Sequence, residues 1–102
     1  MVELSVIVPC YNEKNNIEEL ILKVLNLFDK NTINGEVVLV NDGSDDDSHI
    51  EVEKITRQFK NVIGVSHAEN LGITEAWYSG LKNSQGKYVV TIDADLQYNP
   101  ED

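Results

Sequence analysis

The chain has 102 residues, of which 41% are hydrophobic and 25% charged, and its formal net charge at pH 7 is −10. This length suits one small soluble domain. The negative charge argues against nucleic acid and anionic lipid as partners, because both are bound through clusters of Lys and Arg. An anionic ligand would therefore have to be held through a metal ion or through backbone N–H groups.

The sequence contains one cysteine, Cys10, and no apolar run approaches the roughly 20 residues of a membrane span. One cysteine cannot form an internal disulfide, which suits a reducing compartment. The first residues include Glu3 and lack the basic start of a signal peptide. We therefore expect a cytoplasmic protein, or the cytosolic part of a larger one, in which Cys10 is a small buried residue.

Short β-branched runs alternate along the chain with segments whose apolar residues are spaced by three and four. The runs predict buried parallel strands, and the spaced segments predict helices packed on them. Pro9 is expected to end the first strand. The order βαβαβαβ predicts an α/β domain over residues 1–102, a Rossmann-like three-layer fold with helices on both faces of a mainly parallel four-stranded sheet. The predicted strands cover 4–9, 36–42, 61–67 and 87–95, and the predicted helices lie within 12–30, 43–59 and 72–84.

Polar residues follow all four predicted strands. Ligands of parallel sheets bind outside the carboxyl ends of the strands, so these segments are the place to look for a site. Any one of them could serve only as a turn or a helix cap. Together they bring polar groups to one edge of the sheet, which favours a binding site. The four segments read VPCYNE, VNDGSDD, SHAENLG and IDADLQ.

The pair Asp93 and Asp95 in the last segment is the sharpest signal. Side chains at i and i+2 of an extended segment point the same way, so both carboxylates can face one point. Two such carboxylates repel each other unless a cation or a proton lies between them. Mg²⁺ and Mn²⁺ prefer oxygen ligands, and Mg²⁺ is commonly held by one or two carboxylates plus substrate phosphates. The alternative is a solvated acidic turn.

Several enzyme and signalling classes fit poorly. The chain lacks both G-x-G-x-x-G after the first strand and the P-loop pattern. A haloacid-dehalogenase-like phosphatase would carry its aspartate pair on the first strand, and a receiver-like domain would carry its phosphoacceptor aspartate on the third. A plain α/β fragment that binds no nucleotide remains an alternative.

The segments SVIVPCYNE, VLVNDGSDD, AENLGITEA and YVVTIDADLQYNPED resemble, in order and spacing, the N-terminal half of family-two inverting glycosyltransferases with the GT-A fold. The ending DADLQ is most like members that act on polyprenyl-phosphate acceptors. The resemblance implies a sheet order of 3-2-1-4 and a donor that is a UDP or GDP sugar. It also implies that Asp93 and Asp95 hold Mg²⁺ or Mn²⁺, with Asp95 the more direct ligand. The residues implied to contact the nucleotide sugar are Pro9, Tyr11, Glu13, Asp42, Asn70, Gly72 and Asp93.

The resemblance gives Asp42 the role of reading the base edge, since a carboxylate accepts an imide N–H. It places the catalytic base beyond Asp102, so we expect a donor-binding domain without transferase activity of its own. The fourth strand would then be an unprotected edge, and we expect a homo-oligomer through it. A membrane lipid acceptor is possible for the full-length protein.

Two aromatic residues and two histidines receive structural interpretations. Trp77 departs from the family pattern and is expected to be a core residue of the third helix, as is Tyr78. His49 and His67 are interpreted as surface or strand-end residues and not as ligands.

Overall fold

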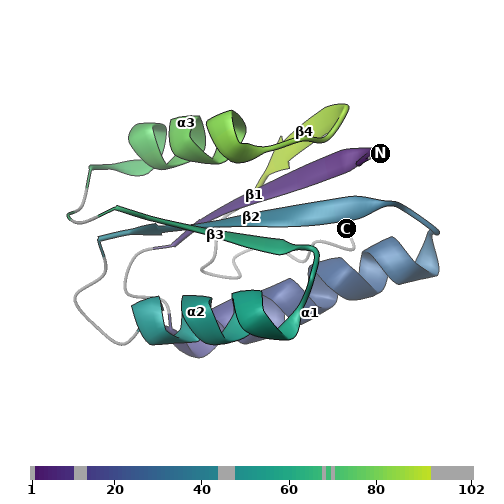
Figure 1. Cartoon of the computed structure of the whole chain (residues 1–102), viewed down its shortest axis with the longest axis horizontal. Helices are drawn as coiled ribbons and strands as arrows, with labels where there is room; N and C mark the ends of the chain where they lie inside the picture. The colour runs from purple at the N-terminus through teal and green to yellow at the C-terminus, as the bar shows by residue number, and fades with distance from the viewer. Residues whose placement is uncertain (1, 11–13, 44–47, 68, 70, 93–102) are drawn as a thin grey trace.

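The computed structural model describes residues 2–10, 14–43, 48–67, 69 and 71–92. Within them, strands and helices alternate as the sequence predicts (Figure 1). The sheet order is β3-β2-β1-β4 and every pair of neighbours is parallel, which confirms the expected topology. The elements are β1 (Leu4–Cys10), α1 (Lys14–Lys30), β2 (Gly35–Asp42), α2 (Ser48–Gln58), β3 (Val62–His67), α3 (Ile73–Asn83) and β4 (Tyr88–Thr91).

The helices cover both faces of the sheet, with α1 and α2 on one side and α3 on the other (Figure 1). Neighbouring residues of a strand point to opposite faces, so β1 and β2 contribute to both layers. Val6 and Val8 pack in the larger core with α1 and α2, whereas Ile7 packs in the smaller core beneath α3. Burial on both faces explains why these strands read as continuous apolar runs.

Small residues, not aromatic ones, form the contact between α3 and the sheet. Ala76 is fully buried, and a Cβ added to the buried Gly80 would collide with the side chain of Ile7. The close approach leaves no room for a large side chain on this face of the helix. The prediction that Trp77 and Tyr78 are core residues is therefore wrong, since they are 40% and 61% exposed.

Pro9 does not end β1, which continues to Cys10. The carbonyl oxygens of Glu3 and Ile7 accept hydrogen bonds from Tyr88 and Ile92, so alternate residues of β1 direct their backbone groups toward β4. Pro9 continues that alternation, and the described part of β4 ends before reaching its level. Its missing N–H therefore removes nothing from the β1–β2 ladder, which explains why the strand tolerates it.

A buried polar cluster at the amino ends of the strands fixes the connection between α3 and β4. The Ser5 hydroxyl donates to Glu36 Oε2 at 2.5 Å, and the Gln85 N–H donates to the same oxygen at 2.6 Å. The Gly86 N–H donates to Ser5 Oγ at 2.8 Å. Glu36 is only 4% exposed, so these bonds satisfy a carboxylate that water cannot reach. The cluster places β4 beside β1.

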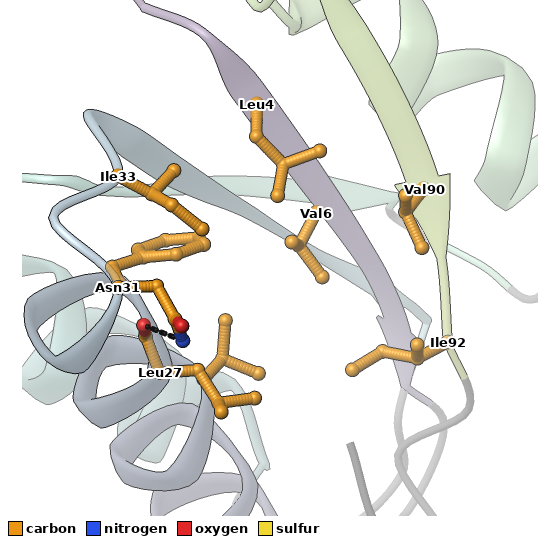
Figure 2. Close-up of a pocket in the computed structure, with 9 residues that line it drawn as sticks. Leu4, Val6, Leu27, Asn31, Ile33, Val90 and Ile92 are labelled. Carbon is orange, nitrogen blue, oxygen red and sulfur yellow. Dashed lines mark hydrogen bonds between the residues drawn. The ribbon is translucent and has the colours of Figure 1, made fainter. Parts of the chain in front are cut away.

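β4 is the thinly covered edge of the sheet. All four of its residues are exposed, and among the described strands it pairs with β1 alone. Beside it, an apolar groove of about 320 Å³ separates α1 from β1 and β4. Figure 2 shows Val90 and Ile92 projecting into this groove from the β4 side. The groove is lined by Leu4, Val6, Val24, Leu27, Phe28, Asn31, Ile33, Val90 and Ile92.

Candidate functional site

The four parallel strands have their carboxyl ends at one edge of the sheet. The predicted site residues lie at or just after these strand ends in the sequence. The structure describes three of them, Pro9, Asp42 and Gly72. Pro9 is buried in β1, in register with Val40 of β2. The other predicted site residues lie outside the described ranges, and they are Tyr11, Glu13, Asn70, Asp93 and Asp95.

Asp42, the last residue of β2, holds the segment that leads into α3. Its Oδ1 accepts a hydrogen bond from the Leu71 N–H at 2.9 Å, and its Oδ2 accepts one from the Gly72 N–H at 2.9 Å. The residue is 4% exposed. Two predicted site residues, Asp42 and Gly72, are therefore brought into direct contact.

A histidine extends this arrangement. His67 ends β3 in register with Asp42, and its Nδ1 lies 2.7 Å from Asp42 Oδ1. The other ring nitrogen, Nε2, lies 2.7 Å from the hydroxyl oxygen of Ser79 on α3. The His67 side chain is 10% exposed and stands at the end of β3, so its interpretation as a strand-end residue is confirmed.

Asp42 carries its charge inside the protein because its neighbours stabilise the ionised form. Burial raises the pKa of the carboxyl, but hydrogen bonds from Leu71, His67 and Gly72 outweigh this effect. The pKa of Asp42 is consequently lower than its ordinary value, and the group is a carboxylate at neutral pH. An ionised carboxylate is a strong acceptor, suited to a ligand that presents an N–H donor.

Gly72 owes its identity to backbone conformation. Its φ is 96°, in the region that disfavours residues with a Cβ, although open space surrounds the position. Its carbonyl accepts the Ala76 N–H at 3.1 Å, so the helix begins directly after the bend. The bend turns the N–H groups of both Leu71 and Gly72 toward Asp42.

The metal prediction is not tested by the described residues, among which no group of three or more His, Cys, Asp or Glu could hold an ion. The predicted ligands Asp93 and Asp95 follow Ile92 and lie outside that part of the chain. Their two carboxylates are the kind of oxygen donor set that suits Mg²⁺ or Mn²⁺. In the same described residues, no helix combines the length and the apolar character needed to cross a membrane.

Sequence reasoning missed His67 and Ser79 as partners of Asp42. A signal was present, because the second and third predicted strands end in Asp42 and His67 and parallel neighbours end at one edge. The contribution of Ser79 depends on how α3 lies across the sheet, which residue spacing alone does not define.

Comparison with known proteins gives a consistent result. The family model described as Glycosyl transferase family 2 matches residues 5–102. The dolichol-phosphate mannosyltransferase of Saccharomyces cerevisiae is 36% identical over 101 residues, which is 98% of this chain and 38% of that protein. The chain spans about a third of the length of three curated relatives that it matches, between 31% and 38%.

Two solved structures share the fold. The mannosyltransferase PcManGT of Pyrobaculum calidifontis, in complex with GDP-Man and Mn²⁺, superposes with a TM-score of 0.78 at 31% identity, over 91% of this chain and 27% of that one. TarS of S. aureus in complex with UDP-GlcNAc gives 0.77 at 32% identity, over 92% of this chain and 27% of that one.

Proposed function

Because this chain belongs to glycosyl transferase family 2, we propose that the carboxyl edge of its sheet binds a nucleoside-diphosphate sugar. For the whole protein we propose transfer of that sugar to an acceptor. The similar structures with GDP-Man and with UDP-GlcNAc support a donor of this class. The observation that carries the proposal is the buried, ionised Asp42 at the edge of the sheet, tied to the bend at Gly72.

In this proposal Asp42 accepts a hydrogen bond from an N–H on the edge of the base. Uracil and guanine both present such a donor, so the acceptor chemistry is compatible with UDP and with GDP. The bend at Gly72 lies against the same carboxylate. Because glycine has no Cβ, the backbone at this bend can come close to the nucleotide. The other proposed contacts to the donor come from Pro9, Tyr11, Glu13, Asn70 and Asp93.

We place Mg²⁺ or Mn²⁺ on the carboxylates of Asp93 and Asp95. A bound divalent ion would neutralise the charge that develops on the departing nucleoside diphosphate. Support comes from the donor set itself and from the similar mannosyltransferase, whose complex contains Mn²⁺. Asp93 follows Ile92, whose N–H donates to the Ile7 carbonyl of β1, so β4 runs toward the carboxyl edge as it approaches the proposed ligands.

The proposed reaction is a single inverting displacement, in which a carboxylate base removes the proton of the acceptor hydroxyl. We assign that base to a part of the full-length protein beyond residues 1–102. The proposal is therefore that this chain binds the donor without transferring the sugar. A polyprenyl-phosphate acceptor for the whole protein is supported by the similarity to dolichol-phosphate mannosyltransferase.

Calorimetry with UDP and GDP, each with and without Mn²⁺, tests donor binding. We expect one nucleotide to bind in a manner that requires Mn²⁺. Asp95→Ala should weaken that binding at least about tenfold, because it removes one of two charged ligands. Asp29→Ala, which removes an exposed carboxylate of α1, is the matched control and should bind like the wild type. Binding of neither nucleotide under either condition would favour the α/β fragment without a nucleotide site.

A second part of the proposal concerns association between copies. The outer edge of β4 offers backbone groups to another strand, and Val89 and Val90 expose apolar side chains on its two faces. The apolar groove beside Val90 and Ile92 continues this surface on the α1 side. Exposed edges of this kind pair with other chains. We assign the partner as β4 of a second copy.

A further inference from the structure

His67 links Asp42 to a second layer of the fold. An ionised carboxylate can only accept hydrogen bonds, so the ring nitrogen that faces Asp42, Nδ1, carries a proton and donates it. In the neutral ring Nε2 then accepts from the Ser79 hydroxyl. The ring is therefore held from both sides, by β2 through Asp42 and by α3 through Ser79.

Both bonds restrict the orientation of the Asp42 carboxylate. The oxygen that accepts from His67 is the same Oδ1 that accepts from the Leu71 N–H, while Oδ2 accepts from Gly72. Rotation of the carboxylate would break the contact with His67 together with one or both backbone contacts. A group that must present a lone pair to a ligand in a fixed direction benefits from this kind of support.

We propose that His67 is a positioning residue for nucleotide binding: it fixes the Asp42 carboxylate, and through it the Leu71–Gly72 bend, in the orientation that receives the base. The nucleotide part of this proposal rests on the proposed function, whereas the orientation of Asp42 and the bend is a property of the ligand-free chain. His67 does not contact the ligand in this proposal. Ser79 supports it by holding the far side of the imidazole ring.

Two substitutions of His67 test its two hydrogen bonds separately, the one to Asp42 and the one to Ser79. In His67→Asn the side-chain amide can place an N–H where Nδ1 lies, so the bond to Asp42 is kept and the bond to Ser79 is lost. In His67→Gln the longer side chain places its amide near the Nε2 position, so the reverse holds. Both variants remove the ring, which makes each the control for the other, and thermal melting checks that both are folded.

The first measurement is hydrogen exchange of the Leu71 and Gly72 amides by NMR, on the ligand-free 102-residue chain. We expect these amides to exchange at the wild-type rate in His67→Asn and about tenfold faster in His67→Gln. Equal protection in the two variants at equal melting temperature would overturn the positioning role. This result does not depend on whether the protein binds nucleotides.

The second measurement is calorimetry with UDP and GDP in the presence of Mn²⁺. We expect His67→Asn to bind within about twofold of the wild type, and His67→Gln to bind about tenfold more weakly. Ser79→Ala removes only the bond that His67→Asn also lacks, so it should bind like His67→Asn. Equal affinities for the two His67 variants would overturn the link to the nucleotide. If the wild type binds neither nucleotide, the proposed function fails and the link with it, while the exchange data still decide the orientation of Asp42.

Discussion

Asp42 and His67 end two neighbouring parallel strands in register, and the His67 Nδ1 lies 2.7 Å from the Asp42 Oδ1. The pairing results from topology, because a parallel sheet brings residues that are 25 positions apart in the chain to the same edge. Together with the N–H groups of Leu71 and Gly72, this pairing keeps a nearly inaccessible carboxylate ionised, which connects the stability of the domain to pH.

Acid should destabilise the domain in part through Asp42. Its pKa in the folded chain is lowered, so its contribution is fully present above the unfolded-state pKa of about 3.9 and is lost as the pH falls through the folded-state value. We expect the urea midpoint of the wild type to fall between about pH 5 and pH 2 more steeply than that of Asp42→Asn. Asp29→Asn, at an exposed position, should retain the wild-type slope. Parallel curves for the wild type and Asp42→Asn would contradict the assignment.

Gly80→Ala should destabilise the fold, although alanine favours helices. The added Cβ would collide with the Ile7 side chain, so α3 must move away from β1. We expect a loss of about 1–3 kcal/mol in the free energy of unfolding, measured with urea. Lys82→Ala changes an exposed residue of the same helix and should have little effect. A Gly80→Ala variant as stable as the wild type would show that α3 does not pack this closely.

Removing the buried carboxylate at the other end of the sheet should release β4. Glu36→Ala leaves the Ser5 hydroxyl and the Gln85 N–H without their acceptor. We expect a cost of about 1–3 kcal/mol for the buried Ser5 hydroxyl. Hydrogen exchange should also accelerate at Tyr88, whose N–H bonds to Glu3 in the adjoining strand pair. Glu53→Ala, at an exposed position of α2, is the control. An effect on global stability with unchanged exchange at Tyr88 would argue against a local role.

A charge on the sheet edge should separate associated copies. Val89→Lys places an ammonium group on β4, and lysine at an edge strand opposes pairing with another chain. We expect the wild type to show a mass above the monomer by light scattering at high concentration, and Val89→Lys to be monomeric. Ile50→Lys makes the same change of charge at an exposed position of α2 and should behave like the wild type. A monomeric wild type would refute association through β4.

The succession of the elements and the parallel sheet followed from the sequence pattern, because burial of the strands on both faces leaves a plain apolar signature. The strand order 3-2-1-4 was implied by the family resemblance. Features that depend on close three-dimensional fit did not follow from the sequence. Pro9 is tolerated inside β1 because its backbone faces away from β2, so its missing N–H removes no bond from the β1–β2 ladder. Trp77 is displaced to the surface because Gly80 brings α3 against Ile7.

For the candidate site, individual residues could be predicted but the contacts that connect them could not. Asp42 and Gly72 lie in the polar segments after the second and third strands, and the family resemblance named them as site residues; the structure joins them by a hydrogen bond. The bridge through His67 to Ser79 depends on the register of β2 with β3 and on the rotation of α3, which no local pattern encodes. The metal pair remains a prediction from spacing and resemblance.

The contact between Asp42 and the bend before α3 also bears on how the chain folds. Gly72 stands at the N-cap position and supplies no side-chain cap, and its N–H donates to a carboxylate 30 residues earlier in the chain, as the Leu71 N–H before it also does. The negative charge near the start of α3 is the Asp42 carboxylate of β2, so the helix gains this stabilisation only after β2 has packed beside it. The first turn of α3 should therefore order late, and a peptide of residues 69–84 alone should be frayed at its amino end.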